Sequence, residues 1–176
     1  FAAALHSLFA RIWLDGGHTG LRVAVNLSAL QFKRGNILES VQKALEISNL
    51  PHSRLELELT ESILLQDVDA AMTTLHSLKE LGVQLSIDDF GTGYSSLSYL
   101  KRLAVDKLKI DQSFVRDLAT DADDAAIVRA IVQLGHTLQL TVIAEGVETA
   151  RQLEFLTDYG CDEAQGYLFS RPLTAA

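Results

Sequence analysis

Residues 83–96 read VQLSIDDFGTGYSS, an apolar run that ends in two adjacent carboxylates and a loop with two glycines. The apolar part is typical of a buried strand. Asp88 and Asp89 repel each other, and taking two neighbouring anions out of water is costly unless a positive charge compensates. A divalent metal ion is the simplest compensator. From this stretch alone, a solvated Asp-Asp-Phe-Gly turn remains the alternative.

On both sides of this stretch, strand and helix patterns alternate along the chain. Apolar or strictly alternating runs predict strands at residues 21–27, 55–61, 83–88, 105–110, 141–144 and about 162–165. Helical spacing of apolar residues predicts helices at 1–14, 37–48, 67–81, 95–102, 112–118, 123–138 and 149–158. This order favours a parallel sheet with crossover helices. The sheet could be open and doubly wound or closed as a barrel, but an early Gly-rich phosphate turn, typical of the open form, is absent.

Polar side chains at the predicted strand ends favour the barrel, because (β/α) barrels place functional groups at the carboxyl ends of many strands. These residues are Asn26, Glu58, Asp88, Asp89, Lys109, Glu145 and Gln165. Most offer oxygen atoms, which hard cations such as Mg²⁺ and Mn²⁺ prefer. Full barrels have about 250 residues, and this chain has 176. We therefore expect an α/β fold, a TIM-like (β/α) barrel with about six βα units, incomplete at the N-terminus.

Each candidate also has a simpler structural interpretation. Asn26 could cap the following helix, and Glu61 could simply begin one. Glu58 and Lys109 lie on alternating strands, so either could be a solvated surface charge. Gln165 could be a structural amide.

The strand-end residues suggest a reaction class. Adjacent carboxylates can bridge two divalent cations about 3.5–4 Å apart, which clamp a phosphodiester and generate hydroxide for in-line attack. Lys109 could orient the attacking water or offset charge on the leaving oxygen, whereas Asp111 is better explained as a cap of the next helix. Metal-dependent phosphodiester hydrolysis is the first interpretation. A metal-assisted carbonyl or enolate reaction with Lys109 as base is the second.

Composition narrows the classes further. The net charge is -8 and the pI is near 5.0, which gives no support to nonspecific binding of DNA or RNA polymers. Cys161 is the single cysteine, so no internal disulfide is expected and a reducing, cytoplasmic location fits. No apolar stretch reaches the roughly 18 residues of a membrane span. The five histidines show no ligand spacing.

Six sequence blocks together resemble one family. They are VNLS (25–28) with QF (31–32), ELELTES (56–62), DDFGTGYSSL (88–97), DKLKID (106–111), AEGVET (144–149), and GCD (160–162) with QGY (165–167). In this order, over about residues 5–173, the chain is similar to EAL domains, the bacterial phosphodiesterases that open cyclic di-GMP to linear pGpG. The resemblance implies a single EAL-type domain over residues 1–176, with a TIM-like barrel fold.

The resemblance also implies roles for the strand-end residues. Asn26, Glu58 and Asp88 look like ligands of one metal ion, Mg²⁺ or Mn²⁺. Asp88 and Asp89 look like the bridge to a second ion. Glu145 resembles a further acidic ligand.

Three more features follow from the same resemblance. Lys109 resembles the lysine that holds the attacking water, and Gln165 resembles a residue near that water and the phosphate. Residues 89–95 resemble a mobile loop that links catalysis to dimerisation. This loop includes Phe90, Gly91, Thr92 and Gly93. Glu61 resembles the glutamate that anchors it.

One departure from the family pattern is clear. The Glu-Ala-Leu signature, whose glutamate is a metal ligand, is absent, so we expect the first strand to be missing from this sequence. The missing part of the family pattern also includes an arginine that contacts the phosphate. We expect a homodimer, with an upstream sensory or GGDEF-type domain as a further expectation. Because that glutamate ligand is missing, we expect weak or no activity from the 176 residues alone. A catalytically inactive cyclic di-GMP receptor or regulatory module is the alternative to the enzyme.

Overall fold

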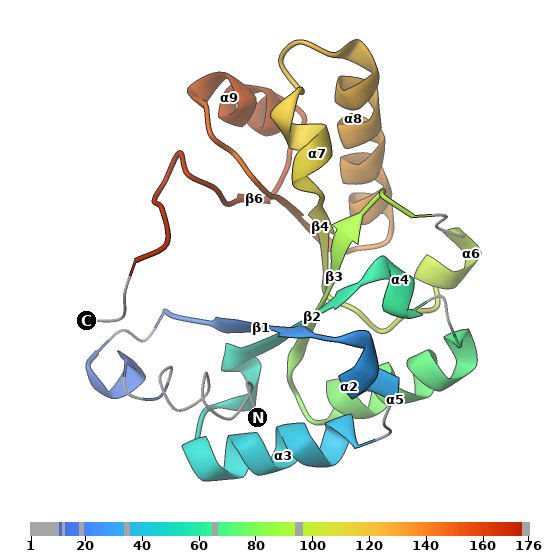
Figure 1. Cartoon of the computed structure of the whole chain (residues 1–176), viewed down its shortest axis with the longest axis vertical. Coiled ribbons are helices and arrows are strands. Elements are labelled where there is room, and N and C mark those ends of the chain that lie inside the picture. Colours follow the sequence, from blue (N-terminus) through green and yellow to red (C-terminus); the bar gives the residue numbers. More distant parts are fainter. Residues whose placement is uncertain are drawn as a thin grey trace. The chain divides into compact units, whose positions relative to one another are not determined.

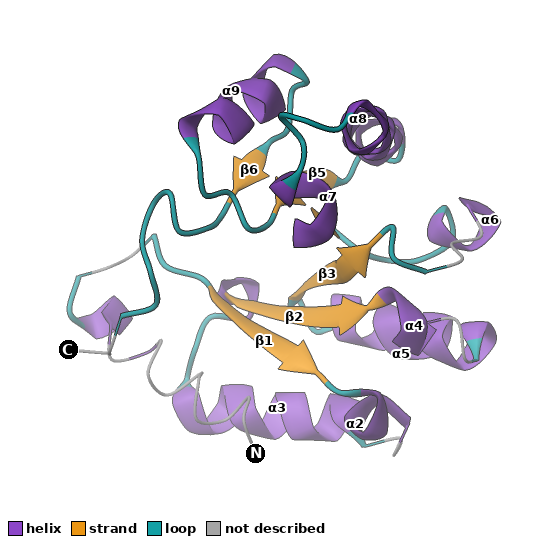
Figure 2. Cartoon of the chain, turned by 45° about the horizontal axis from the view of Figure 1, so that its top comes forward, coloured by secondary structure: helices purple, strands orange, loops and turns teal. Residues whose placement is uncertain are grey.

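The computed structural model describes residues 11, 13–17, 20–33, 36–64, 67–93 and 97–173. The helix predicted over residues 1–14 lies mostly outside them. Figure 1 labels the elements in chain order, and Figure 2 separates helices from strands by colour. Among the described residues, no helix is both long and apolar enough to cross a membrane.

Six strands form one sheet in the order of the sequence, β1-β2-β3-β4-β5-β6. Their bounds are β1 Val23–Leu27, β2 Leu55–Thr60, β3 Gln84–Phe90, β4 Lys107–Ile110, β5 Thr141–Ala144 and β6 Glu163–Ala164. The β1–β2, β4–β5 and β5–β6 pairs are parallel. Sequential parallel strands joined by helices confirm the predicted α/β class and are the arrangement of an incomplete TIM-like barrel.

Among the described residues, a helix follows every strand except β6. The helices are α2 Ala29–Lys33, α3 Ile37–Ser48, the 3₁₀ turn η1 His52–Arg54, α4 Glu61–Leu64, α5 Val68–Glu80, α6 Leu97–Leu100, α7 Gln112–Arg116, α8 Ala122–Thr137 and α9 Ala150–Asp158. The predicted bounds of α3 are confirmed. Asp111 caps α7 by accepting a hydrogen bond from the backbone N–H of Ser113, as predicted.

The chain divides into two compact units, residues 1–86 with 96–105 and residues 87–95 with 106–176. β3 passes from the first unit into the second. In the first unit, α3 and α5 contact each other, and Leu57 and Leu75 are fully buried. In the second, α8 contacts both β4 and β5, and Leu108, Val128 and Val142 are fully buried.

Buried charge distinguishes β2 and β4 from ordinary core strands. Alternation in β2 would suit a strand with one solvated face, but both of its faces are buried, including Glu56 and Glu58. Lys107 and Lys109 of β4 are buried as well. Neither Glu58, 8% exposed, nor Lys109, 3% exposed, is a solvated surface charge.

Candidate active site

The backbone of β3 brings its two adjacent carboxylates together. The strand runs on through Phe90 instead of ending at Asp88 as predicted. Asp89 has a φ of 54°, in the left-handed region that Asp and Asn tolerate better than most residues. In a regular strand, successive side chains point to opposite faces. The left-handed residue interrupts that alternation, and the Asp89 N–H donates a hydrogen bond to Asp88 Oδ1 over 3.1 Å.

Lys109 lies between two carboxylates that come from neighbouring strands. Its Nζ is 3.0 Å from Asp88 Oδ1 and 2.6 Å from Glu145 Oε1. The Lys109 side chain is only 4% exposed, so these ion pairs are poorly screened by water. Gln165, just after β6, donates a hydrogen bond from Nε2 to Glu145 Oε1 over 2.9 Å. The carboxyl ends of β3, β4 and β5 and the residue after β6 therefore supply one connected cluster.

Asp88, Asp89 and Glu145 form a group that could hold a metal ion. One carboxylate oxygen from each lies within 4.8 Å of the other two. Oxygen donors of this kind suit hard divalent cations. Mutually repelling carboxylates also favour a cation beside them. The donor set thus fits a hard divalent ion.

Asp89 and Asp111 share a hydrogen bond between their carboxyl groups. Burial raises the pKa of Asp89, and the negative charges of Asp88 and Asp111 raise it further, while Lys109 lowers it. Burial also acts to raise the pKa of Asp111, but hydrogen bonds from Ser113 and Asp89 outweigh it and hold that pKa below its usual value. Without a cation, Asp89 is therefore the more readily protonated carboxyl of the two.

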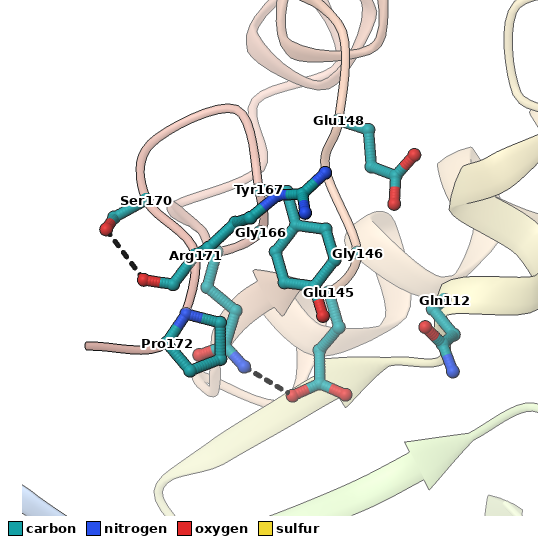
Figure 3. A pocket seen from close by; sticks show the side chains of 10 residues that line it. Gln112, Glu145, Gly146, Glu148, Gly166, Tyr167, Ser170, Arg171 and Pro172 are labelled. Atoms are coloured by element: carbon teal, nitrogen blue, oxygen red, sulfur yellow. Dashed lines mark hydrogen bonds between the residues drawn. The ribbon is translucent and has the colours of Figure 1, made fainter. Parts of the chain in front are cut away.

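A hollow of about 480 Å³ opens beside Glu145 (Figure 3). Its polar and aromatic lining includes Gln112, Glu145, Glu148, Gln165, Tyr167 and Arg171. The Arg171 guanidinium lies over the Tyr167 ring, 5.4 Å from its centre, which is a cation–π distance. Strand-end reasoning missed Glu148 and Tyr167 because both follow their strands by several residues, although both lie in the quoted AEGVET and QGY blocks.

Asn26 and Glu58 face each other in the register of β1 and β2. Both lie toward the carboxyl ends of their strands, as expected for residues at a barrel mouth. Glu61 begins α4 and is buried. The ligand roles of Asn26 and Glu58 beside Asp88, and the anchoring role of Glu61, stay predictions.

The loop after β3 begins at Gly91. Gly91 has a φ of 100°, and a Cβ there would lie 2.9 Å from the Phe114 ring, so the position requires glycine. Phe90 is buried, whereas Thr92 and Gly93 are exposed. Thr92 Oγ1 donates to the Asp89 carbonyl over 2.9 Å. Residues 94 and 95 of the predicted loop lie outside the described part of the chain, and the loop's regulatory role stays a prediction.

A family model for the EAL domain matches residues 2–172. The chain therefore belongs to the EAL domain family, and the resemblance found in its sequence is confirmed. The bifunctional diguanylate cyclase/cyclic di-GMP phosphodiesterase MucR of Pseudomonas aeruginosa is 56% identical over 165 residues, which are 94% of this chain and 24% of MucR. The cyclic di-GMP phosphodiesterase NbdA of the same organism is 51% identical over 160 residues, which are 91% of this chain and 20% of NbdA.

A solved structure gives the same result for the fold. The PaMucR phosphodiesterase in complex with c-di-GMP is 54% identical and superposes with a TM-score of 0.95, covering 98% of this chain and 70% of that one. The chain spans a quarter or less of the curated relatives MucR and NbdA. The relatives thus establish the family and the fold.

Proposed function

We propose that this EAL domain hydrolyses cyclic di-GMP to linear pGpG with Mg²⁺ or Mn²⁺ at a two-metal site. The observation that supports this most is the buried Lys109 ammonium held between Asp88 and Glu145. A receptor needs no such group at the reacting bond. Relatives named as cyclic di-GMP phosphodiesterases support the same substrate.

The acidic cluster and the β1–β2 pair would hold the two ions. Asn26, Glu58 and Asp88 would bind the first, and Asp88, Asp89 and Glu145 the second. When bound, such ions polarise a phosphodiester and lower the pKa of water. The existing hydrogen bond from Gln165 to Glu145 would then keep that carboxylate in place.

Lys109 has the position of a group that orients water and stabilises developing negative charge. Its ammonium has three donors, and two carboxylates already direct it. Because the ammonium is shielded from water, its attraction for a developing negative charge is stronger than it would be in solvent. We propose that this ammonium lies beside the attacked phosphate.

The hollow beside Glu145 suits a nucleotide. Tyr167, a residue that is 56% exposed, offers an aromatic ring, and bases stack on such rings. Arg171 adds a positive charge beside it. We propose that this hollow receives part of the cyclic dinucleotide next to the scissile bond.

We further propose that residues 1–176 form one EAL-type domain that acts in the cytoplasm as a homodimer within a longer protein. The family-model range of 2–172 and the greater length of the relatives support the domain and the longer protein. The predicted loop over residues 89–95 motivates the dimer. Light scattering of the purified protein at micromolar concentration should give twice the monomer mass; a monomer mass with full activity would refute the dimer.

A turnover assay tests the proposed reaction. The protein that carries these residues should convert cyclic di-GMP to pGpG with Mg²⁺ or Mn²⁺ and stop when EDTA is added. D88N should lower kcat at least about a hundredfold, because it removes a shared ligand. D158N, at an exposed position of α9, is the matched control and should leave kcat unchanged. Tight binding of the dinucleotide without product would establish the receptor instead.

A further inference from the structure

Gln152 is a buried amide whose side chain makes four hydrogen bonds. It lies in the first turn of α9 and is 5% exposed. Its Oε1 accepts from the backbone N–H of Glu148 and of Thr149, over 2.9 and 2.8 Å. Its Nε2 donates to the carbonyls of Val115 and Arg116, over 3.0 and 3.1 Å. Both ends of the amide are therefore fully used.

One half of this pattern is an ordinary capping box. Thr149 Oγ1 accepts a hydrogen bond from the Gln152 backbone N–H, and Gln152 Oε1 accepts one from the Thr149 backbone N–H. The other half is not needed for a cap, because it reaches the last residues of α7, more than 30 positions earlier in the chain. A glutamate would complete the box equally well, yet it could not donate to the two α7 carbonyls.

The two segments that Gln152 joins both belong to the candidate active site. The segment 145–149 contains Glu145, and its backbone is fixed again where the Val147 N–H donates to the Gln165 carbonyl over 3.0 Å. At the other end, α7 begins after Asp111, which hydrogen-bonds Asp89. Gly146 packs against Gln112 so closely that a Cβ there would lie 2.7 Å from Gln112 Cβ. Two members of the acidic cluster are thus supported by segments that meet at one buried amide.

We propose that Gln152 is a positioning residue for the acidic cluster: it holds the Glu145 segment and α7 at a fixed separation, so that Glu145 and Asp89 are spaced for a divalent cation. The proposal rests on the proposed function for its role in catalysis. Gln152 itself reaches no reacting atom. Residues that orient ligands from behind typically change metal affinity or activity by about ten- to a hundredfold when replaced.

Two variants separate the two halves of the pattern in the protein that carries these residues. Q152L removes all four hydrogen bonds at similar volume, and Q152E keeps the acceptor for Glu148 and Thr149 while removing both donors to α7. Q133L, at an exposed position of α8, is the matched control. The measurements are the Kd for Mn²⁺ by calorimetry, amide hydrogen exchange at Glu148 and Thr149, and cyclic di-GMP turnover.

Q152L should weaken Mn²⁺ binding about ten- to a hundredfold and speed exchange at both amides at least about tenfold. Q152E should keep the amides protected and still weaken Mn²⁺ binding at least about threefold. A purely structural role lowers the folded fraction, which changes the binding stoichiometry and leaves Kd unchanged. If Q152L does not fold, the Kd for Mn²⁺ of Q152E decides the test.

A Kd for Mn²⁺ within twofold of wild type in every folded Gln152 variant overturns the proposal, and so does an equal loss in Q133L. If Mn²⁺ binding depends on Gln152 but the wild type makes no pGpG, the positioning role stands and the proposed function fails. If the wild type turns over cyclic di-GMP and the Gln152 variants match it in both turnover and the Kd for Mn²⁺, the proposed function stands and the positioning role fails. A wild type that binds no Mn²⁺ contradicts both.

Discussion

Replacing Lys109 with methionine removes the ammonium between Asp88 and Glu145 while keeping a side chain of similar length. The two ion pairs measure 3.0 and 2.6 Å, and the three side chains are 4%, 12% and 17% exposed. Such a group is shielded from water, so its partners cannot be resolvated without local rearrangement. The metal-free protein is therefore the state in which the substitution should cost most.

Removing one partner of a buried ion pair destabilises proteins by about 3–5 kcal/mol. For a domain of this size, that corresponds to a fall in Tm of roughly 6–20 °C. The matched control is K107M, two residues earlier on β4. Lys107 pairs with Glu163 over 3.2 Å, and Glu163 is 48% exposed, so water can solvate the carboxylate left behind and the loss should be smaller than in K109M.

Thermal unfolding with and without Mn²⁺ measures both the loss of stability in the metal-free protein and the stabilisation by the cation. Mn²⁺ should raise the Tm of K109M by more than that of wild type, because the carboxylates left without an ammonium attract the cation more strongly. It should raise the Tm of K107M about as much as that of wild type. In turnover, K109M should lose at least about a hundredfold in kcat, and K107M should keep most of it.

Two results would contradict this reasoning. One is a K109M protein whose metal-free Tm falls no further than that of K107M, which would mean that the two ion pairs contribute little. The other is a K109M protein with a near-normal kcat, which would exclude Lys109 from the reaction. Equal Mn²⁺ responses in wild type and K109M would show that the cation binds elsewhere.

Two further predictions concern ionisable groups. Because the pKa of Asp89 in the folded protein lies above its usual value of 3.8, its ionisation opposes folding as pH rises through the folded pKa; D89N should therefore have the higher Tm at pH 7–8 without divalent ions, and the advantage should vanish near pH 3.8 and shrink with Mn²⁺. Partial burial raises the pKa of Cys161 to about 11, so about one thiol in a thousand is ionised at pH 8, and alkylation monitored by mass spectrometry should be slow there and speed up about tenfold per pH unit; fast alkylation at pH 8 would refute the raised pKa.

The order of elements was predictable because each strand and helix carries its own hydrophobic period. The bounds of α3 and β5, and the cap at Asp111, follow from local chemistry that a single sequence displays. The convergence of Lys109, Glu145 and Gln165 was also predictable, since parallel strands bring their carboxyl ends to one edge.

Other contacts between distant segments were not predictable. The Thr149-x-x-Gln152 spacing signals a capping box, but nothing in it shows that Gln152 also bonds the end of α7. Likewise, β3 extends through Phe90 with Asp89 in the left-handed conformation. An Asp-Asp pair in the sequence does not predict that conformation. Lys107 alternates in the same way as Lys109, so only tertiary burial shows that both are enclosed.

Hydrolysis of cyclic di-GMP in ¹⁸O-labelled water tests the central proposal most directly. The account predicts linear pGpG with a single ¹⁸O atom in its terminal phosphate, formed only with Mg²⁺ or Mn²⁺ and lost in K109M. Such a label shows that water attacks phosphorus at a metal-dependent site. Bound but intact dinucleotide, or product that forms unchanged in EDTA, would contradict the account.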